Sequence, residues 1–537
     1  MNDNNKITHR AQNLVIGGGI AGIVTALELL EGGQSVVLVD RDRRERFGGL
    51  ARWAFGGMAF IGTPEQRRLK IDDSPELALD DWIRFGELAP DDQWPRAWAK
   101  CYVEESKTLV YDWLKSQGLK FMPAVNWVER GSSIKGNSRA RYHILWGTGC
   151  ELVETLIDRL LNHPRRSELT LLHQHHAAGL TFHDGVASGC HGLDEGGRKA
   201  FCVQADNTIV ASGGVNGSEE QVRRHWPEGW PHTPETILNG AHPFSDGNVH
   251  EAVASSGGRL THLQNMWNYA AGVPHPQAHF KGHGLSLIPC KSGLWLTPEG
   301  EMVGPAPMVT GFDTRELCRQ VVKHPYTWQV LNWKIAAKEM AISGSEHNPR
   351  ILDHQLFRFL LDLLLGNDRL IRQMVSESPE FLVADDLEDL AAMMNGLTGE
   401  DRIDAARLNE LVASHDRTLA DSLLQERDPA VQRILELRKW RGDRLRTCKL
   451  QPIRQKKAGP LLAIRLHFIS RKSLGGIQTD LQGRVMAHDG RVISGLYAVG
   501  EAAGFGGGGV SGKRSLEGTF LSGCILTARK TAAAICA

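Results

Sequence analysis

The segment that decides the fold is residues 13–40, NLVIGGGIAGIVTALELLEGGQSVVLVD. A short apolar run at 13–16 leads into the glycine turn GGGIAG, apolar residues recur at helical spacing over 20–30, and an uninterrupted aliphatic run fills 36–39. This succession of strand, turn, helix and strand is typical of a βαβ unit. The continuous apolar second strand indicates a parallel sheet that is covered on both faces. We therefore predict an α/β fold.

The glycine turn has the spacing G-x-G-x-x-G between a strand and a helix, which is the context that dinucleotide binding requires. We expect Gly17 to make the tight turn, Gly19 to let the backbone approach a pyrophosphate, and Gly22 to let helix and strand pack closely. Asp40, at the end of the second strand, would accept hydrogen bonds from ribose hydroxyls. The motif predicts a Rossmann-like domain whose cofactor contacts here are Gly17, Gly19, Ile20, Ala21, Gly22, Asp40 and Arg41.

Four later glycine clusters favour FAD over NAD. A second pair, Gly48-Gly49, and then Gly56-Gly57 follow the acidic residue, which suits a flat isoalloxazine lying on backbone. A strand-like run at 201–210 ends in ASGG, and the run GLYAVG at 495–500 leads into GEAAGFGGGG. NAD alone would leave these clusters unexplained. The further predicted FAD contacts are Gly48, Gly49, Leu50, Ala51, Gly56, Gly57, Ala177, Ser212, Gly213, Gly500, Glu501, Ser515 and Leu516.

Length and composition exclude several classes of protein. A chain of 537 residues predicts two to four folding units. Lys plus Arg and Asp plus Glu both total 62, so no global basic field exists to collect nucleic acid. The polar N-terminus resembles no signal peptide, and no stretch approaches about 18 uncharged apolar residues. We expect a cytoplasmic protein without a membrane span.

Cysteine and histidine spacing predicts no metal site. The nine cysteines are scattered singly, without a C-x-x-C pair. His275, His279 and His283 recur every four residues, which on a helix would make a metal-binding face. Pro274 and Gly282 are among the residues that break such a helix, so we expect no metal there.

Changes in residue composition along the chain predict a discontinuous domain. Residues 352–446 are charged, rich in leucine and poor in glycine, which indicates helices. Nucleotide-binding signatures lie on both sides of this segment. We therefore predict a discontinuous Rossmann-like FAD-binding domain over 1–268 and 451–537, with an inserted α+β substrate cap domain over 269–450.

Motifs along nearly the whole chain resemble the fumarate reductase / 3-ketosteroid dehydrogenase flavoprotein superfamily. Within it, the chain is most similar to ketosteroid-dehydrogenase-like FAD-binding dehydrogenases. The resemblance implies an FAD domain with a substrate cap, and flavin-linked chemistry on a carbon–carbon bond next to a carbonyl. The segments that carry it are FGGLARWAFGG, DSPELALDDW, FSDGNVHEAVASSGGRL, MWNYAAGV, SGSEHNP, RKSLGGIQTD, GLYAVGEAAG and GGGGVSGKRSLEGTF.

Two departures from the family pattern argue against a dicarboxylate substrate and against a covalently linked flavin. Fumarate reductases carry a terminal motif similar to GVHGxNRLGGNSL, whose His and Arg hold the substrate carboxylates, and here these positions are Ser511 and Ser515. A dicarboxylate in a dry pocket needs such partners, and only the nearby Lys513, Arg514 and Arg315 could replace them. No histidine lies beside Gly48, where succinate dehydrogenases link the flavin, so we expect non-covalent FAD.

Desaturation beside a ketone needs a base for the α-proton, an oxyanion donor, and flavin N5 in line for the β-hydride. The resemblance implies that tyrosines supply the acid and base. Tyr111 lies off an apolar stripe and is expected at the surface. The candidates left open are Tyr269, Tyr497, Tyr142 and the adjacent His143.

The leading expectation is an FAD-dependent dehydrogenase acting on a small molecule, a 3-ketosteroid-like ring ketone, with an external electron acceptor. One alternative is a flavin-dependent reductase of an unsaturated acid. The other is a flavoprotein that binds FAD without a substrate of its own.

Overall fold

The computed structural model describes residues 7–514 and 516–537. The chain forms two compact units. Unit 1 comprises Met1–Glu228, Ala241–Trp267 and Arg471–Ala537, and unit 2 comprises Gly229–Gly240 and Asn268–Ser470. Among the described helices, none combines the length and the apolarity that crossing a bilayer requires.

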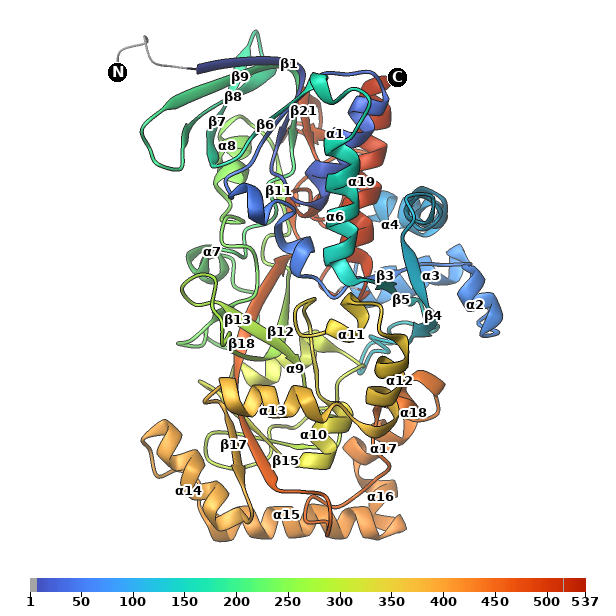
Figure 1. Ribbon diagram of the computed structural model, residues 1–537, viewed down its shortest axis with the longest axis vertical. Coiled ribbons are helices and arrows are strands. Elements are labelled where there is room, and N and C mark those ends of the chain that lie inside the picture. Colours follow the sequence, from blue (N-terminus) through green and yellow to red (C-terminus); the bar gives the residue numbers. More distant parts are fainter. Residues whose placement is uncertain (1–6, 515) are drawn as a thin grey trace. The chain divides into compact units, whose positions relative to one another are not determined.

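The centre of unit 1 is a parallel sheet in the order β21-β9-β1-β2-β6 (Figure 1). The antiparallel strand β20 extends it at one edge, and the β7–β8 hairpin pairs with β9. The predicted strands at 13–16 and 36–39 are confirmed. The strands are β1 (Ile7–Ile16), β2 (Val36–Val39), β6 (Leu169–Leu172), β7 (His175–His183), β8 (Val186–Asp194), β9 (Ala200–Val210), β20 (Arg484–Met486) and β21 (Val492–Ala498).

Helices α1 (Ile20–Glu31), α6 (Thr148–Leu161) and α19 (Thr519–Cys536) run side by side in unit 1 (Figure 1). The helix expected at 20–30 is therefore confirmed. Because α1 is buried on nearly all sides, its polar groups need local partners. Thr25 Oγ1, for example, donates to Ala21 O at 2.8 Å.

A small antiparallel sheet, β3-β5-β4, belongs to the same unit. It consists of β3 (Gly57–Ala59), β4 (Lys120–Asn126) and β5 (Tyr142–Trp146). Arg141, just before β5, donates from Nη2 to Asp73 Oδ1 at 2.8 Å and from Nη1 to Asp81 Oδ2 at 2.7 Å. Asp81 lies on α3 (Pro75–Gly86), and both carboxylates are buried, so this cluster ties the start of β5 to α3.

Other elements of unit 1 surround these sheets. They are α2 (Pro64–Arg68), α4 (Gln93–Ser106), α5 (Trp113–Ser116), α7 (Glu219–Arg224), α8 (Asn248–Ser255), β11 (Leu260–Thr261) and β19 (Gly476–Ile477).

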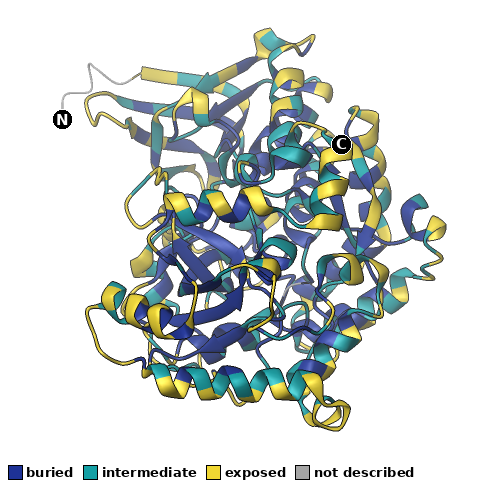
Figure 2. Ribbon diagram, turned by 60° about the horizontal axis from the view of Figure 1, so that its bottom comes forward, coloured by how far each residue is buried: buried dark blue, intermediate teal, exposed yellow. Residues whose placement is uncertain are grey.

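Unit 2 is built on a second sheet whose strands are largely buried, whereas the helices around it carry exposed residues (Figure 2). The order is β14-β15-β18-β12-β13-β16, and β10 and β17 also pair with β18. The strands are β10 (Leu238–Asn239), β12 (Met266–Pro274), β13 (Gly284–Ile288), β14 (Leu294–Leu296), β15 (Thr327–Asn332), β16 (Ala341–Ile342), β17 (Phe381–Ala384) and β18 (Leu461–Ser473).

The helical prediction for residues 352–446 is confirmed apart from β17. Aspartate side chains accept backbone N–H groups at several helix starts, as Asp386 does at α14 and Asp404 at α15. The helices of unit 2 are α9 (Thr314–Val321), α10 (Trp333–Glu339), α11 (Pro349–Leu352), α12 (Leu356–Leu365), α13 (Asp368–Glu377), α14 (Leu387–Thr398), α15 (Ala405–Ala420), α16 (Ser422–Arg427), α17 (Pro429–Leu437) and α18 (Arg441–Arg446).

The unit boundaries differ from the sequence boundaries. Residues 451–470 belong to unit 2 rather than to the FAD-binding part, because β18 pairs along Leu461–Leu466 with β15. Residues 229–240 join unit 2 as well, since Leu238 in β10 pairs with Ile469. These pairings link segments far apart in sequence, so texture along the chain did not reveal them.

Replacement of Arg141 should destabilise unit 1. Arg141→Met leaves the buried Asp73 and Asp81 carboxylates without this cation, which costs about 3 kcal/mol of unfolding free energy. Urea unfolding measures the loss. Arg491→Met breaks an exposed pair with Asp489 and should leave stability unchanged within error. Equal effects of the two substitutions would contradict the buried-pair assignment.

Candidate active site

The carboxyl ends of the parallel strands in unit 1 meet at one edge of the sheet. Gly17 N donates to Val39 O at 2.8 Å, Ala211 N to Ile16 O at 2.8 Å, and Val499 N to Val210 O at 2.9 Å. The loops that follow β1, β2, β9 and β21 therefore start side by side. In open α/β sheets, ligands bind at this edge.

The three glycines of the G-x-G-x-x-G turn occupy different environments. Gly17 has φ +113°, and a Cβ there would collide with Ala211 O. A Cβ at Gly22 would collide with Gly17 O, so α1 lies directly against its own turn. A Cβ at Gly19 would meet nothing within 4 Å, which leaves the helix start open to a ligand.

Asp40 is fixed beside the turn. Its Oδ2 accepts a hydrogen bond from Gly18 N at 2.5 Å, and its Oδ1 accepts one from Asp42 N at 2.6 Å. Burial raises the pKa of Asp40, although these amide donors oppose the shift. The neighbouring Arg41 is held differently: its guanidinium pairs with Glu195 at 2.9 Å and Asp246 at 2.7 Å.

The second glycine pair folds back onto the first turn. Gly48 N donates to Gly18 O at 3.0 Å, and a Cβ at Gly49 would lie 3.2 Å from Gly19 Cα. Leu50 and Ala51 continue in a short 3₁₀ turn, Gly49–Trp53. Gly56 has φ +92° and packs against the backbone of Thr148, while Gly57 packs against the Tyr142 ring. Residues 48–57 thus run from the glycine turn to the start of α6.

The loops after β9 and β21 complete the cradle. Ser212 borders Gly17, and Gly213 has φ +76° and packs against Ser245. Gly500 N donates to Thr527 Oγ1 at 2.9 Å, and a Cβ there would lie 2.7 Å from Ala21 Cβ.

Three predicted contacts remain to be placed. Ala177 is a core residue of β7, whose first residue, His175, donates its N–H to Asp40 O at 2.9 Å. Leu516 is buried just before α19. Ser515 lies outside the described residues.

Glu501 and Lys472 interact electrostatically at the end of β21 and β18, and the sequence analysis did not bring these two residues together. Glu501 Oε1 accepts a hydrogen bond from Ser473 N at 3.0 Å, and burial raises the pKa of Glu501 to about 7. Burial lowers the pKa of Lys472, whose Nζ lies 4.4 Å from the centroid of the Phe520 ring. Lys472 lies in RKSLGGIQTD, one of the segments that carry the family resemblance, and this was the sequence feature that could have pointed to it.

The residues present fit FAD. The open side of Gly19, the backbone amides of the first turn of α1, and the fixed Asp40 carboxylate suit a pyrophosphate and a ribose. The glycines at 48–49 and Gly500 border the same turn, and because they lack side chains they leave space for a ligand there. Whether these residues contact the cofactor remains a prediction.

The structure corrects two expectations about ring residues. His143 is fully buried, with Nε2 2.8 Å from Thr63 Oγ1 and Nδ1 2.7 Å from Arg141 O, and burial lowers its pKa to about 4. A group enclosed in this way cannot reach a substrate, so His143 is not proposed as catalytic. Tyr111 is buried rather than exposed, and its hydroxyl donates to Glu65 Oε2 at 2.6 Å.

The other candidate tyrosines lie in different places. Tyr142, on β5 in unit 1, lines a small cavity with Tyr102, Leu516 and other residues. Tyr497 lies within β21 opposite Arg484 of the edge strand, and burial raises its pKa. Tyr269 lies on β12 in unit 2. It is partly exposed, whereas the other residues from Met266 to Val273 are buried.

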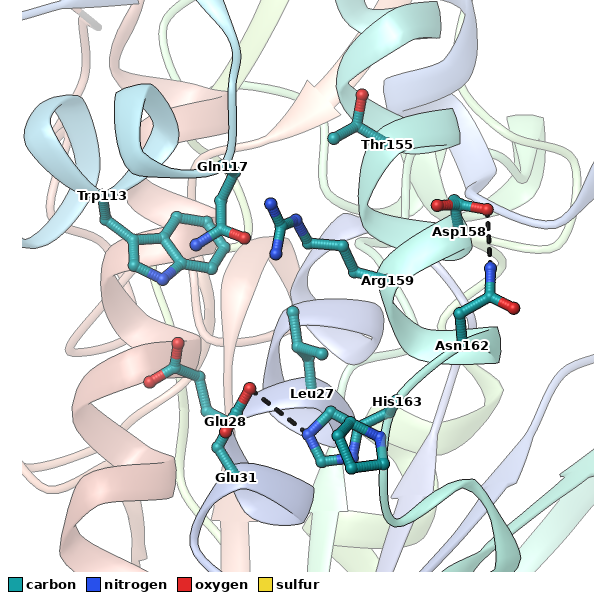
Figure 3. A pocket seen from close by; sticks show the side chains of 11 residues that line it. Leu27, Glu28, Glu31, Trp113, Gln117, Thr155, Asp158, Arg159, Asn162 and His163 are labelled. Atoms are coloured by element: carbon teal, nitrogen blue, oxygen red, sulfur yellow. Dashed lines mark hydrogen bonds and ion pairs between the residues drawn. The ribbon is translucent and has the colours of Figure 1, made fainter.

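A larger hollow of about 590 Å³ lies elsewhere on unit 1 (Figure 3). It is lined by the far ends of α1 and α6, away from the glycine turn, and Arg159 extends into it. His163 Nε2 lies 3.3 Å from Glu31 Oε1 at its rim. This hollow is not part of the cofactor cradle.

Comparison with known proteins agrees with this cradle. The family model of the FAD binding domain matches residues 13–521. A KsdD-like steroid dehydrogenase of Mycolicibacterium smegmatis is 39% identical over 533 residues, which cover 95% of this chain and 96% of the relative. The chain therefore belongs to the FAD-binding-domain family. It is an FAD-dependent oxidoreductase, and within the family it is similar to the KsdD-like steroid dehydrogenases.

Solved structures show the same fold. The 3-ketosteroid Δ1-dehydrogenase of Sterolibacterium denitrificans in complex with 1,4-androstadiene-3,17-dione has a TM-score of 0.70 at 14% identity, covering 98% of this chain and 99% of that chain. The open conformation of a flavocytochrome c3 fumarate reductase has a TM-score of 0.70 at 18% identity, covering 98% and 78%. The predicted FAD-binding α/β fold is confirmed.

Substitution of Gly19 should separate cofactor binding from folding. Gly19→Ala adds a methyl group into open space, so the FAD-free chain should fold as wild type. The same methyl group obstructs the approach of a pyrophosphate, so FAD should bind at least about tenfold more weakly, about 1.4 kcal/mol. Fluorescence titration of the apoprotein measures this, and circular dichroism monitors the fold. Gly22→Ala is the contrast, because its methyl group collides with Gly17 O and should disturb folding itself. Unchanged FAD affinity in Gly19→Ala would contradict the cradle.

The buried Glu501 should make stability depend on pH. Because the pKa of Glu501 is raised, the folded chain keeps this proton at pH values where the unfolded chain has lost it. Stability therefore falls as pH rises through about 4.5 to 7, by up to about 1.4 kcal/mol per unit. Glu501→Gln should remove this fall.

Melting temperatures from pH 4.5 to 7 with excess FAD test this expectation. Glu220→Gln, at an exposed position of α7, removes the same charge and should keep the wild-type slope. A wild-type slope in Glu501→Gln would show that another group titrates.

Proposed function

We propose that the protein is an FAD-dependent dehydrogenase that introduces a carbon–carbon double bond next to a carbonyl. The proposed substrate class is a 3-ketosteroid-like ring ketone, and the electrons pass to an external acceptor. FAD, when bound, supplies the acceptor for the β-hydride. We infer that FAD is held non-covalently, since no histidine lies beside Gly48 in the sequence.

One observation carries the substrate class. The similarity to the KsdD-like steroid dehydrogenase spans 95% of the chain, so it includes unit 2 as well as the glycine cradle of unit 1. A fumarate reductase of Shewanella frigidimarina also aligns over 96% of the chain, but at only 25% identity. The higher identity to the steroid dehydrogenase, unit 2 included, supports a related substrate.

The chain's own residues have separate tasks in this proposal. Backbone N–H groups at the start of α1 hold the pyrophosphate, and Asp40 positions a ribose while its carboxylate is kept in place by Gly18 N. The α-proton is accepted by the hydroxyl oxygen of Tyr269, Tyr142 or Tyr497. A tyrosine with its ordinary pKa near 10 is a weak base at neutral pH, so the bound state must stabilise its anion.

The unsaturated-acid alternative requires cations for the substrate carboxylates, and the candidate cations of this chain contact other groups. Lys513 Nζ pairs with Glu87 Oε2 at 3.0 Å, and Arg514 pairs with the other oxygen of Glu87. Arg315 lies over the Trp230 ring at 5.1 Å in unit 2. If Lys513 and Arg514 both turned to a substrate dianion, Glu87 would lose both of the cations that compensate its charge.

Anaerobic titration with a 3-ketosteroid tests the reaction class. The purified protein should show oxidised flavin absorbance near 450 nm, which the steroid bleaches as hydride is transferred. After denaturation, the flavin should remain in the supernatant as free FAD. If the spectrum stays oxidised, the steroid assignment fails, and reoxidation of chemically reduced protein by an enoate would favour the reductase. No response to either compound would favour a flavoprotein without its own substrate.

Tyrosine variants identify the base. If Tyr269 takes the proton, Tyr269→Phe should slow bleaching about 100-fold or more while FAD stays bound. Tyr142→Phe and Tyr497→Phe are tested in parallel, and whichever variant shows the loss carries the role. Tyr326, a half-buried tyrosine packed near Trp328 in unit 2, provides the control, and Tyr326→Phe should keep the wild-type rate. Wild-type rates in all three test variants would remove these tyrosines from the mechanism.

A further inference from the structure

Three histidines that the sequence places on a broken helix converge in unit 2 without a helix. His275 follows the last residue of β12, His283 precedes the first residue of β13, and His275 N donates to His283 O at 2.9 Å. Their rings stack with centroids 4.3 Å apart and an interplanar angle of 8°. His279, in the connecting loop, lies 5.6 Å from His275 between ring centroids. The hairpin end therefore brings these rings together although the segment forms no helix.

A second segment brings a carboxylate and a fourth histidine to the same place. Glu346 and His347 follow β16, whose Ile342 pairs with Leu287 of β13. Glu346 Oε1 lies 2.7 Å from His275 Nε2 and 3.8 Å from His347 Nδ1. Its other oxygen, Oε2, lies 3.9 Å from His279 Nε2. One carboxylate is thus bracketed by three imidazoles from two loops.

One buried nitrogen atom of this cluster has no hydrogen-bond partner. The side chain of His347 is only 6% exposed, and its Nδ1 has no hydrogen-bond partner. The His275 side chain is 3% exposed, whereas Glu346 is 40% exposed and leaves the cluster open to solvent on one side. A buried nitrogen without a partner is costly and needs an explanation. A ligand reaching the cluster from solvent would satisfy it.

We propose that His275, Glu346 and His347 form a binding site for one divalent transition-metal ion of the zinc class. Their ligand atoms all lie within 4.8 Å of one another. Bonds of about 2.1 Å in tetrahedral geometry place ligand atoms about 3.4 Å apart, so side-chain adjustments of an ångström or less close the site. Two imidazoles and a carboxylate suit zinc and its neighbours rather than calcium or magnesium, which prefer all-oxygen sites. His279 is the available fourth ligand.

Binding requires one hydrogen bond to change. Gln277 N donates to His275 Nδ1 at 3.0 Å, so in the metal-free chain the ring proton is on Nε2 and is donated to Glu346. When Nε2 ligates a metal, this proton moves to Nδ1 and the Gln277 amide releases its bond. Gln277 lies in a turn outside helix and strand, where such a shift is possible. The metal would then join the β12–β13 loop to the segment after β16.

Zinc binding to the tag-free, FAD-containing protein tests the site. After treatment with a chelator and incubation with Zn²⁺, gel filtration and elemental mass spectrometry should find one zinc per chain, and calorimetry should give its affinity. Zn²⁺ should also raise the melting temperature of the wild type, because it binds the folded state. Neither readout depends on catalytic activity.

Matched variants decide the outcome. His347→Gln and Glu346→Gln should each weaken zinc binding at least about tenfold and abolish the thermal shift. His183→Gln is the control, because His183 lies 3.1 Å from Asp184 at an exposed position and should keep wild-type binding. If His347→Gln fails to fold, the more exposed Glu346→Gln decides alone. Absence of stoichiometric zinc in the wild type, or wild-type affinity in Glu346→Gln, would overturn the proposal.

Discussion

The architecture of unit 1 depends on backbone contacts that leave no room for a side chain. A Cβ at Gly22 would collide with Gly17 O, and a Cβ at Gly17 would collide with Ala211 O. Because both positions are glycine, α1 begins directly on the ends of β1 and β9. Gly17 and Gly22 therefore pack tightly against protein backbone, whereas the space beside Gly19 is open. The later glycine segments border the same turn and depend on its position.

Local sequence was sufficient wherever neighbours along the chain determine structure. The strands at 13–16 and 36–39 and the helix from Ile20 followed from apolar periodicity and a glycine turn. Tyr111 was misplaced because its burial comes from Glu65 and from rings on other elements, such as Phe60 and Phe121. The boundary of the compact units differs from the one predicted at 450 for the same reason, since strand pairing across the sequence joins residues 461–466 of β18 to unit 2.

The candidate site shows the same division. The glycine spacing and Asp40 predicted a cradle whose geometry the structure then described, because the motif is a local arrangement. By contrast, the sequence offers Lys513 and Arg514 as substrate partners, whereas in the structure both pair with Glu87, which follows α3. The histidines at 275, 279 and 283 have a helical spacing that Pro274 and Gly282 interrupt, so the sequence predicts no metal site there. The pairing of β13 with β16 brings Glu346 and His347 beside them. Spacing rules cannot report a partner contributed by another loop.

The discontinuity of unit 1 has a consequence for biosynthesis. Strand β9 pairs through Thr208–Val210 with β21, and Gly500 packs against Ala21, yet β21 and Gly500 both lie in residues 471–537. During translation, the glycine turn after β1 is made early, but the parallel sheet of unit 1 is complete only after β21 has been made. Until then, residues 208–210 of β9 lack their partner strand, although residues 200–204 already pair with β8. Unpaired strand edges promote aggregation, so the nascent chain exposes this short edge until residues 471–537 have been made.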